Sequence, residues 1–571
     1  MSDLHQPPRY RHWTQILLDV GTLYAIFWSL SVAFLCWMLP LIRSLVPSLW
    51  GLALPFLLPV FPSLALALSL WFLSRRHGYP TVWAAFAKWI RQGIQYALGN
   101  IAPAASPPAL TLGTIADGHP FGFDSPALDL HLLVDGKTRQ GKSTLLASIA
   151  WQDVARADCA VLLLDPHAAL VDHLLAAGLP DLASDRLVVL LADQDAVPGF
   201  NLLQPLPGES PQDCAARLVE SALALWFDAR LVEAQRFQNY AFHAAWALAE
   251  TGWTVLEVEP LLRHRTFRQH IAAQVSDPQL RSWLAELDRE RDDRIRDLTE
   301  STVNRFRAFG RGTTALILGQ RRTTFDLPRL LDTNGVLLAA LPTAALGDTG
   351  AYLAAGVLLG LVDACLARRP KDSPVHTNPR LRLLADEAQA YPVPPLRRLL
   401  AERAGFGAGL VLATQSLGQL PGYGRGGTPP LARFILNNVG AHAVFACGAE
   451  EAHTMAEELF RPDPLLVKHR REPWVTFYSP REQMAFWAKQ IQNLPPHTFF
   501  AHVPGRPPVR CTTLPLPARL DADGLVAVRA ELARRVGRPR AEVEAELARR
   551  RRWIYEGGSL TPEEESPDGW L

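Results

Sequence analysis

Short apolar runs recur along the chain from residue 129 onward, and helical patterns lie between many of them. The runs cover residues 129–135, 159–165, 186–192, 335–342, 380–387, 409–415 and 441–447. Each has the length of one strand, and an apolar run without alternation indicates a strand that is buried on both faces. We therefore predict an α/β fold in which helices cover both sides of a mostly parallel sheet.

Two long stretches without a charged residue precede these strands, at residues 20–42 and 44–74. Each exceeds the roughly 20 residues that a helix needs to cross a bilayer. A two-helix transmembrane hairpin is predicted over residues 15–75, with spans at 20–39 and 52–73. The alternative is a buried helical hairpin of a soluble protein.

Positive charges flank this hairpin on both sides. Arg43 alone lies between the spans, whereas the flanking segments carry Arg9, Arg11, Arg75, Arg76, Lys88 and Arg91. Because such charges favour the cytoplasmic side, residues 1–14 and the large remainder are predicted to be cytoplasmic. Residues 76–128 are expected to form a juxtamembrane segment and linker.

Composition limits the chemistry that the chain can perform. Lys and Arg number 57 and Asp and Glu 56, so a nucleic acid would have to bind a local patch or channel rather than a global basic field. The six cysteines are scattered without paired spacing, and the 16 histidines form no ligand-spaced cluster. These patterns argue against a disulfide framework and a zinc site, and they fit a reducing compartment.

The strongest motif lies between the first strand and the helix that follows it. Its G-x-x-x-x-G-K-S pattern comprises Gly136, Lys137, Thr138, Arg139, Gln140, Gly141, Lys142 and Ser143, with Thr144 next. Backbone N–H groups and the helix N-terminus of such a loop surround phosphates. Lys142 is expected to reach the β- and γ-phosphates of ATP, and the Ser143 hydroxyl to bind Mg²⁺.

Polar residues at three other strand ends complete a predicted hydrolytic site. Asp386 is expected to bind Mg²⁺ through water, and Glu387 to orient and deprotonate the attacking water. Gln415 is expected to sense the γ-phosphate or to position water. Asp165 ends another strand, where it either joins this site or caps the following turn.

Several motifs occur in a characteristic order. They are GKTRQGKST, LLLDPH, GFNLLQP, ILGQRRTTFDL, LRLLADEAQ, LATQSLGQL and NNVGAHAVFACGAEEA. Together with the predicted spans, they resemble the TraG-type coupling proteins of conjugation and type IV secretion, a branch of the hexameric DNA-translocase ATPases. The resemblance extends over residues 15–515. One departure is that Ala168 and Ala169 follow Asp165-Pro166-His167, where the family often has glycine and an acid.

The resemblance implies a RecA-like P-loop core at residues 129–204 and 316–515, interrupted by an all-α domain at 205–315. Residues 205–315 are helical in pattern throughout, as this implies. The family further implies a homohexamer at the bacterial inner membrane, with DNA, relaxosome or secreted substrate proteins and type IV secretion channel proteins as partners. It also implies an arginine contributed by a neighbouring subunit, for which Arg403 is the first candidate and Arg398 the second. Both could instead be surface helix arginines.

The C-terminal extension, residues 516–571, has a different composition. Gly537 and Pro539 divide its charged helical pattern in two, and Arg549–Arg552 form a basic run. This run is either a DNA or partner contact or part of a solvated helical pair with internal ion pairs. An acidic tail follows.

The function predicted from these features is ATP-driven DNA translocation by a membrane-anchored coupling protein. Two alternatives remain open. The first is an ATP-dependent receptor for secreted proteins without DNA transport. The second is a membrane scaffold that binds nucleotide without hydrolysing it.

Overall fold

The computed structural model describes residues 108–556, apart from 184, 193, 227–230, 370–379, 392, 421–430, 465 and 472–473. The two predicted membrane spans lie outside these residues. In the described part of the chain, α15 (Thr343–Ala367) is the one helix long and apolar enough to cross a membrane, but 78% of its apolar window is buried within the protein. It is therefore a core helix of this domain.

The central sheet has eleven strands in the order β2-β1-β14-β13-β10-β3-β9-β8-β4-β7-β5. From β10 to β5 every neighbouring pair is parallel, whereas β13, β14, β1 and β2 are antiparallel additions at one edge. The strands are β1 (Leu110–Thr114), β2 (Pro120–Phe123), β3 (Leu132–Asp135), β4 (Cys159–Asp165), β5 (Leu187–Leu190), β7 (Val336–Ala340), β8 (Arg380–Ala385), β9 (Ala408–Thr414), β10 (Ala441–Val444), β13 (Thr498–His502) and β14 (Val509–Thr512).

All seven predicted strands are confirmed, as β3, β4, β5, β7, β8, β9 and β10. Their alternate residues enter different cores: Leu133 packs in one hydrophobic cluster, and Leu132 and Val134 pack in the other. Both faces of the sheet are thus buried, which explains why these runs are apolar throughout. The strands β1 and β2 lie in residues for which the sequence predicted a linker.

Helices cover the two faces and form the segment between β6 (Ala196–Val197) and β7. Every described element from Pro211 to Leu318 is helical, as the pattern of residues 205–315 predicted. The helices here are α7 (Pro211–Trp226), α8 (Leu231–Glu250), α9 (Val258–Arg263), α10 (Arg265–Gln274), α11 (Pro278–Arg289), α12 (Asp292–Phe306) and α13 (Gly312–Leu318). The others are α4 (Lys142–Arg156), α5 (Ala169–Ala176), α6 (Leu179–Ala183), α14 (Leu327–Asp332), α15, α16 (Val393–Glu402), α17 (Leu431–Asn438), α18 (Ala449–Leu459) and α19 (Pro480–Gln492). A hairpin of β11 (Val467–Arg471) and β12 (Trp474–Phe477) lies between α18 and α19.

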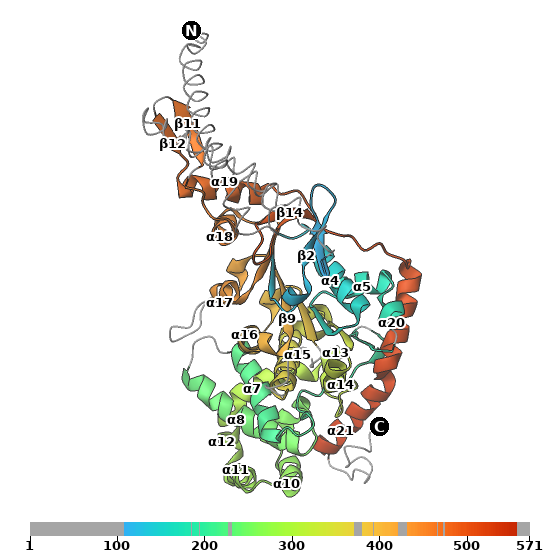
Figure 1. The fold of residues 1–571 in the computed structure, drawn as a ribbon. Helices are drawn as coiled ribbons and strands as arrows, with labels where there is room; N and C mark the ends of the chain where they lie inside the picture. The colour runs from blue at the N-terminus through green and yellow to red at the C-terminus, as the bar shows by residue number, and fades with distance from the viewer. Residues whose placement is uncertain are drawn as a thin grey trace, which may run out of the picture. The chain divides into compact units, whose positions relative to one another are not determined.

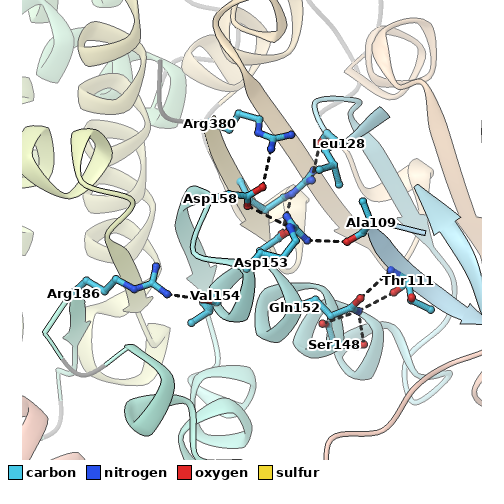
Figure 2. A network of polar contacts seen from close by, with 12 residues as sticks. Ala109, Thr111, Leu128, Ser148, Gln152, Asp153, Val154, Asp158, Arg186 and Arg380 are labelled. Atoms are coloured by element: carbon cyan, nitrogen blue, oxygen red, sulfur yellow. Dashed lines mark hydrogen bonds and ion pairs between the residues drawn. The ribbon is translucent and has the colours of Figure 1, made fainter. Parts of the chain in front are cut away.

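A polar network fixes α4, the helix that follows the P-loop, against the sheet. Figure 2 shows Gln152 beside Thr111: the Thr111 N–H donates to Gln152 Oε1, and Gln152 Nε2 donates to the Thr111 carbonyl, both at 2.8 Å. Asp153 is fully buried and accepts from Arg156 at 2.5 Å and from Arg382 of β8 at 3.0 Å. Removing one partner from such a buried pair is costly, so the orientation of α4 is strongly fixed.

The C-terminal extension forms two helices, α20 (Ala522–Val536) and α21 (Arg540–Glu556), as Gly537 and Pro539 predicted. Figure 1 shows them along one side of the domain, in red. Between them, β15 (Arg538–Pro539) pairs with β6. Within the basic run, Arg550 is 1% exposed and contacts Glu257, Glu546 and the Gly319 carbonyl. The internal-ion-pair interpretation is therefore correct for Arg550, because its charge is paired with glutamates inside the protein.

Candidate functional site

The P-loop begins where β3 ends and closes at the N-terminus of α4. Gly136 and Gly141 have φ angles of 152° and 107°, in the region that favours glycine. A Cβ added at Gly136 would lie 2.5 Å from Phe445 Cβ, and one at Gly141 would lie 2.9 Å from His497 Nδ1. Both glycines are thus required by backbone conformation and by space. No side chain caps the start of α4, so its first N–H groups point into the loop.

Lys142 is buried beneath this loop, with 6% of its surface exposed. Its Nζ donates to the carbonyl of Gly136 at 2.6 Å and to that of Lys137 at 3.0 Å. Burial lowers the pKa of Lys142, while the charges of Glu387 and Asp386 oppose the shift. The ammonium group therefore lies inside the loop, where a phosphate oxygen can replace a carbonyl as its partner.

Asp386 lies at the carboxyl end of β8, opposite Ser143. The Ser143 hydroxyl donates to Asp386 Oδ2 at 3.3 Å, and Asp386 is 7% exposed. Burial, followed by the charges of Glu387 and Asp165, raises the pKa of Asp386 to about 6. A hydroxyl and a carboxylate are the hard oxygen ligands that Mg²⁺ prefers. The two residues predicted to bind Mg²⁺ therefore lie together and fit that ion chemically.

Glu387 is held by two glutamine amides. Its backbone is left-handed, with φ of 53°, a costly conformation for a residue with a side chain. Oε1 accepts from Gln415 Nε2 at 2.6 Å, and Oε2 accepts from Gln389 Nε2. Thr138 of the P-loop donates to Gln415 Oε1 at 3.0 Å. A continuous hydrogen-bonded chain thus runs from the P-loop through Gln415 to Glu387.

The strand order explains this convergence. Because β9 lies between β3 and β8, its carboxyl end carries Gln415 between the P-loop and the Asp386–Glu387 pair. Parallel strands place their carboxyl ends at one sheet edge, so residues far apart in sequence meet there. The structure thus brings together Lys142, Ser143, Asp386, Glu387 and Gln415.

Asp165 caps the turn after β4. Its carboxylate accepts from the backbone N–H groups of His167, Leu170 and Val171 at 2.8–3.0 Å, so it caps the start of α5. The capping alternative is confirmed. Asp165 nevertheless also lies close enough to raise the pKa of Asp386.

Arg403 and Arg398 lie in an ion-pair network within the same chain. Arg403 Nε and Arg398 Nε each donate to Asp363 of α15 at 2.7 Å, and Arg398 also pairs with Glu220 of α7. The Arg403 guanidinium lies 5.4 Å from the centroid of the Phe406 ring. A role for either arginine in the site of a neighbouring subunit stays a prediction.

Three residues at the site were not predicted from the sequence. Gln389 lies within the motif LRLLADEAQ, so that motif offered a signal for it. His497 precedes β13, and its N–H donates to the Gln140 carbonyl of the P-loop at 2.7 Å. Glu451 of α18 accepts from the Leu417 N–H just beyond Gln415. Glu451 lies within the motif NNVGAHAVFACGAEEA, which marks the segment but not its contact. No local signal marks His497, because its contact depends on how distant segments pack.

The fold and the site define a P-loop α/β domain. Solved structures similar to it include the bacterial conjugative coupling protein TrwBdeltaN70 in its unbound form, 16% identical with a TM-score of 0.48 over 75% of this chain and 93% of that one. The plasmid coupling protein TrwB in complex with a non-hydrolysable ATP analogue has the same identity and TM-score, over 74% and 93%. VirB4 of Thermoanaerobacter pseudethanolicus is 13% identical, with a TM-score of 0.45 over 73% and 99%.

No protein-family model and no curated protein sequence matches the chain. The structures found include conjugative coupling proteins, the class that the sequence motifs resemble. Their TM-scores lie below 0.5, so these structures carry no argument about function. An ATPase activity has to be argued from the residues of the site, and a cargo from the order of the sequence motifs.

Proposed function

We propose that this chain is a Mg²⁺-dependent ATPase of the RecA-like class that moves DNA to a type IV secretion or conjugation channel. The observation that carries the ATPase is the hydrogen-bonded chain Thr138–Gln415–Glu387, with Ser143 and Asp386 beside it. A protein that only bound nucleotide would not need a carboxylate held at the strand end by two amides.

Each residue has a distinct role in this mechanism. Lys142 exchanges its carbonyl partners for the β- and γ-phosphates, and the N-terminus of α4 adds N–H donors. Ser143 and Asp386 would hold Mg²⁺, Asp386 through water. Mg²⁺ held there would supply positive charge that neutralises the charge developing on the phosphates.

Glu387 accepts the proton of the attacking water. Gln415 and Gln389 fix its two oxygens, so the carboxylate points in one direction before the water arrives. Thr138 connects Gln415 to the loop that surrounds the phosphates. A γ-phosphate oxygen that accepted the Thr138 hydroxyl in place of Gln415 Oε1 would free one side of the Gln415 amide and so link nucleotide state to the orientation of Glu387.

The cargo and the assembly are proposed from the order of the motifs. That order favours DNA as the substrate, a homohexamer as the working form and an inner-membrane anchor at residues 15–75. Relaxosome or secreted substrate proteins and channel proteins are the proposed partners. An ATP-dependent receptor for secreted proteins is the outcome against which DNA transport must be tested.

The test is the ATPase rate of the full chain in lipid nanodiscs, with and without single- or double-stranded DNA, at low and high salt. DNA transport predicts stimulation that weakens steeply with salt, because phosphate contacts release counterions. Lys142→Ala should abolish turnover, and Lys489→Ala, an exposed lysine on α19, serves as the matched control. ATP turnover that DNA does not change at any salt concentration would reject DNA as the cargo.

A further inference from the structure

Two carboxyl groups lie together below the P-loop. Asp135 is the last residue of β3 and is fully buried. Glu451 lies in the first turn of α18, which follows β10, and β10 pairs in parallel with β3 so that Val444 is opposite Asp135. One oxygen of each carboxyl and Cys447 Sγ lie within 4.8 Å of one another. Neither residue is needed for the roles assigned above.

Asp135 is buried and Glu451 is half-buried, and two carboxylates this close to each other cannot both be ionised at low cost. Burial raises the pKa of Asp135 well above its usual range, and the nearby carboxyl of Glu451 raises it further. Both oxygens of Asp135 are buried without a hydrogen-bond donor among the described residues, so only a proton would join them to Glu451. A hydrogen bond between two carboxyl groups requires one proton. The other groups that face the pair are Lys142, which lowers the pKa of Asp135, and the Cys447 thiol, whose own pKa burial raises.

The pair connects two parts of the proposed site. Asp135 directly precedes Gly136, whose carbonyl accepts from Lys142, and the Asp135 carbonyl accepts from the Phe445 N–H at 2.8 Å. Glu451 accepts from the Leu417 N–H, two residues beyond Gln415. A bond between the two carboxyls therefore ties the start of the P-loop to the segment that carries Gln415.

We propose that Asp135 and Glu451 share one proton and that the resulting carboxyl pair positions the P-loop relative to Gln415 for nucleotide binding and hydrolysis. The inference rests on the proposed ATPase function. Both are positioning residues, because they act through Lys142 and Gln415. The shared proton also leaves one negative charge, rather than two, close to the phosphates and to Lys142.

The sign of the pH dependence follows from the raised pKa. The proton is present below that pKa and is lost as the pH rises through it. Loss leaves two carboxylates that repel each other and the nucleotide phosphates, so nucleotide affinity should fall on the alkaline side. Asp135→Asn keeps a neutral donor toward Glu451 at every pH, and the alkaline fall should disappear.

The matched variant is Glu451→Gln. In this variant the one ionisable carboxyl of the pair is that of Asp135, the more deeply buried of the two residues. The affinity of this variant for nucleotide at pH 7 should fall about tenfold or more, because the negative charge of the pair can then lie only on Asp135, the more buried residue beside the P-loop. Asp135→Asn should lose less than Glu451→Gln, and Glu450→Gln, the exposed neighbour on α18, is the control. The experiment measures binding of a fluorescent ATP analogue to the full chain between pH 6 and pH 10, alongside thermal unfolding of each variant.

Infrared spectroscopy of the protein without nucleotide gives a second measurement. The wild-type chain should show the C=O stretch of a buried protonated carboxyl, and Asp135→Asn should lack it. This band does not depend on ATP turnover, so its presence in a chain without ATPase activity would reject the proposed function but support the shared proton. Three results would each overturn the proposal. They are absence of the band, equal losses of nucleotide affinity in Asp135→Asn and Glu451→Gln, and a stoichiometric metal ion that is lost in Cys447→Ser.

Discussion

Gln415 Nε2 donates a 2.6 Å hydrogen bond to Glu387 Oε1 and so joins the carboxyl ends of β9 and β8. Its own Oε1 accepts from Thr138, so one side chain contacts both the P-loop and the proposed general base. A glutamine amide is suited to this position because it donates through nitrogen and accepts through oxygen. Binding at the P-loop can therefore change how Glu387 is held.

Glu387→Gln should trap ATP. The amide keeps the size of the side chain but cannot accept the proton of water, so turnover should fall by about 10²–10⁴-fold while binding persists. Single-turnover hydrolysis and equilibrium binding of ATP measure the two effects separately. Glu458→Gln, an exposed glutamate on α18, is the control. Normal turnover in Glu387→Gln would show that another residue activates water.

Gln415→Ala should lower kcat more than it changes KM. Removal of the amide frees one oxygen of Glu387, and a lost hydrogen bond to a charged group corresponds to roughly 10–100-fold. Thr138→Val removes only the contact from the P-loop to Gln415 and should have a smaller effect in the same direction. A rise in KM with unchanged kcat in Gln415→Ala would instead indicate a role in substrate binding alone.

The sequence predicted the elements whose signals are local. Asp386 and Glu387 were found because an apolar strand ends in two acids, and Lys142 because its loop has fixed spacing. Residues 110–123 gave no such signal: β1 and β2 are short, and they belong to the sheet only through pairing with each other and with β14 near the C-terminus.

The contacts between distant segments were beyond prediction for a related physical reason. Nothing near His497 in the sequence indicates the P-loop, and the motif that contains Glu451 does not show which segment Glu451 contacts. Both contacts depend on β10, which lies beside β3, pairs with β13 and precedes α18. Asp165 shows the opposite case, because capping of the following helix is a local interaction and was foreseen as one of two alternatives.

His442 should make the protein sensitive to acid. Burial, followed by the charge of His502, lowers its pKa from 6.5 to about 4. The unfolded chain takes up this proton as the pH falls through 6.5, but the folded chain does not until about 4, so stability should decrease across that window, by on the order of 3 kcal/mol. Neither ring nitrogen of His442 has a hydrogen-bond partner among the described residues.

An apolar substitution therefore tests this contribution. His442→Leu should flatten the dependence of Tm on pH between 6.5 and 4, whereas His453→Gln, at an exposed position on α18, should leave that dependence as in the wild type. An unchanged slope in His442→Leu would place the acid sensitivity in other groups.

Arg403 offers a test of whether neighbouring subunits complete the site. Its Nε donates to Asp363 at 2.7 Å, and its side chain is 12% exposed, so Arg403→Ala should lower Tm whether or not the arginine has a catalytic role. Loss of activity in this variant alone is therefore uninformative.

Mixing Arg403→Ala subunits with Lys142→Ala subunits separates the two roles, because each inactive variant retains the residue that the other lacks. If Arg403 stabilises the charge on the γ-phosphate of a neighbour, some interfaces in the mixture combine an intact P-loop with an intact arginine, and ATPase activity should reappear. The mass of the mixture must first show that mixed assemblies form. If the activity then stays at the sum of the separate variants, the role of Arg403 is limited to its ion pair with Asp363.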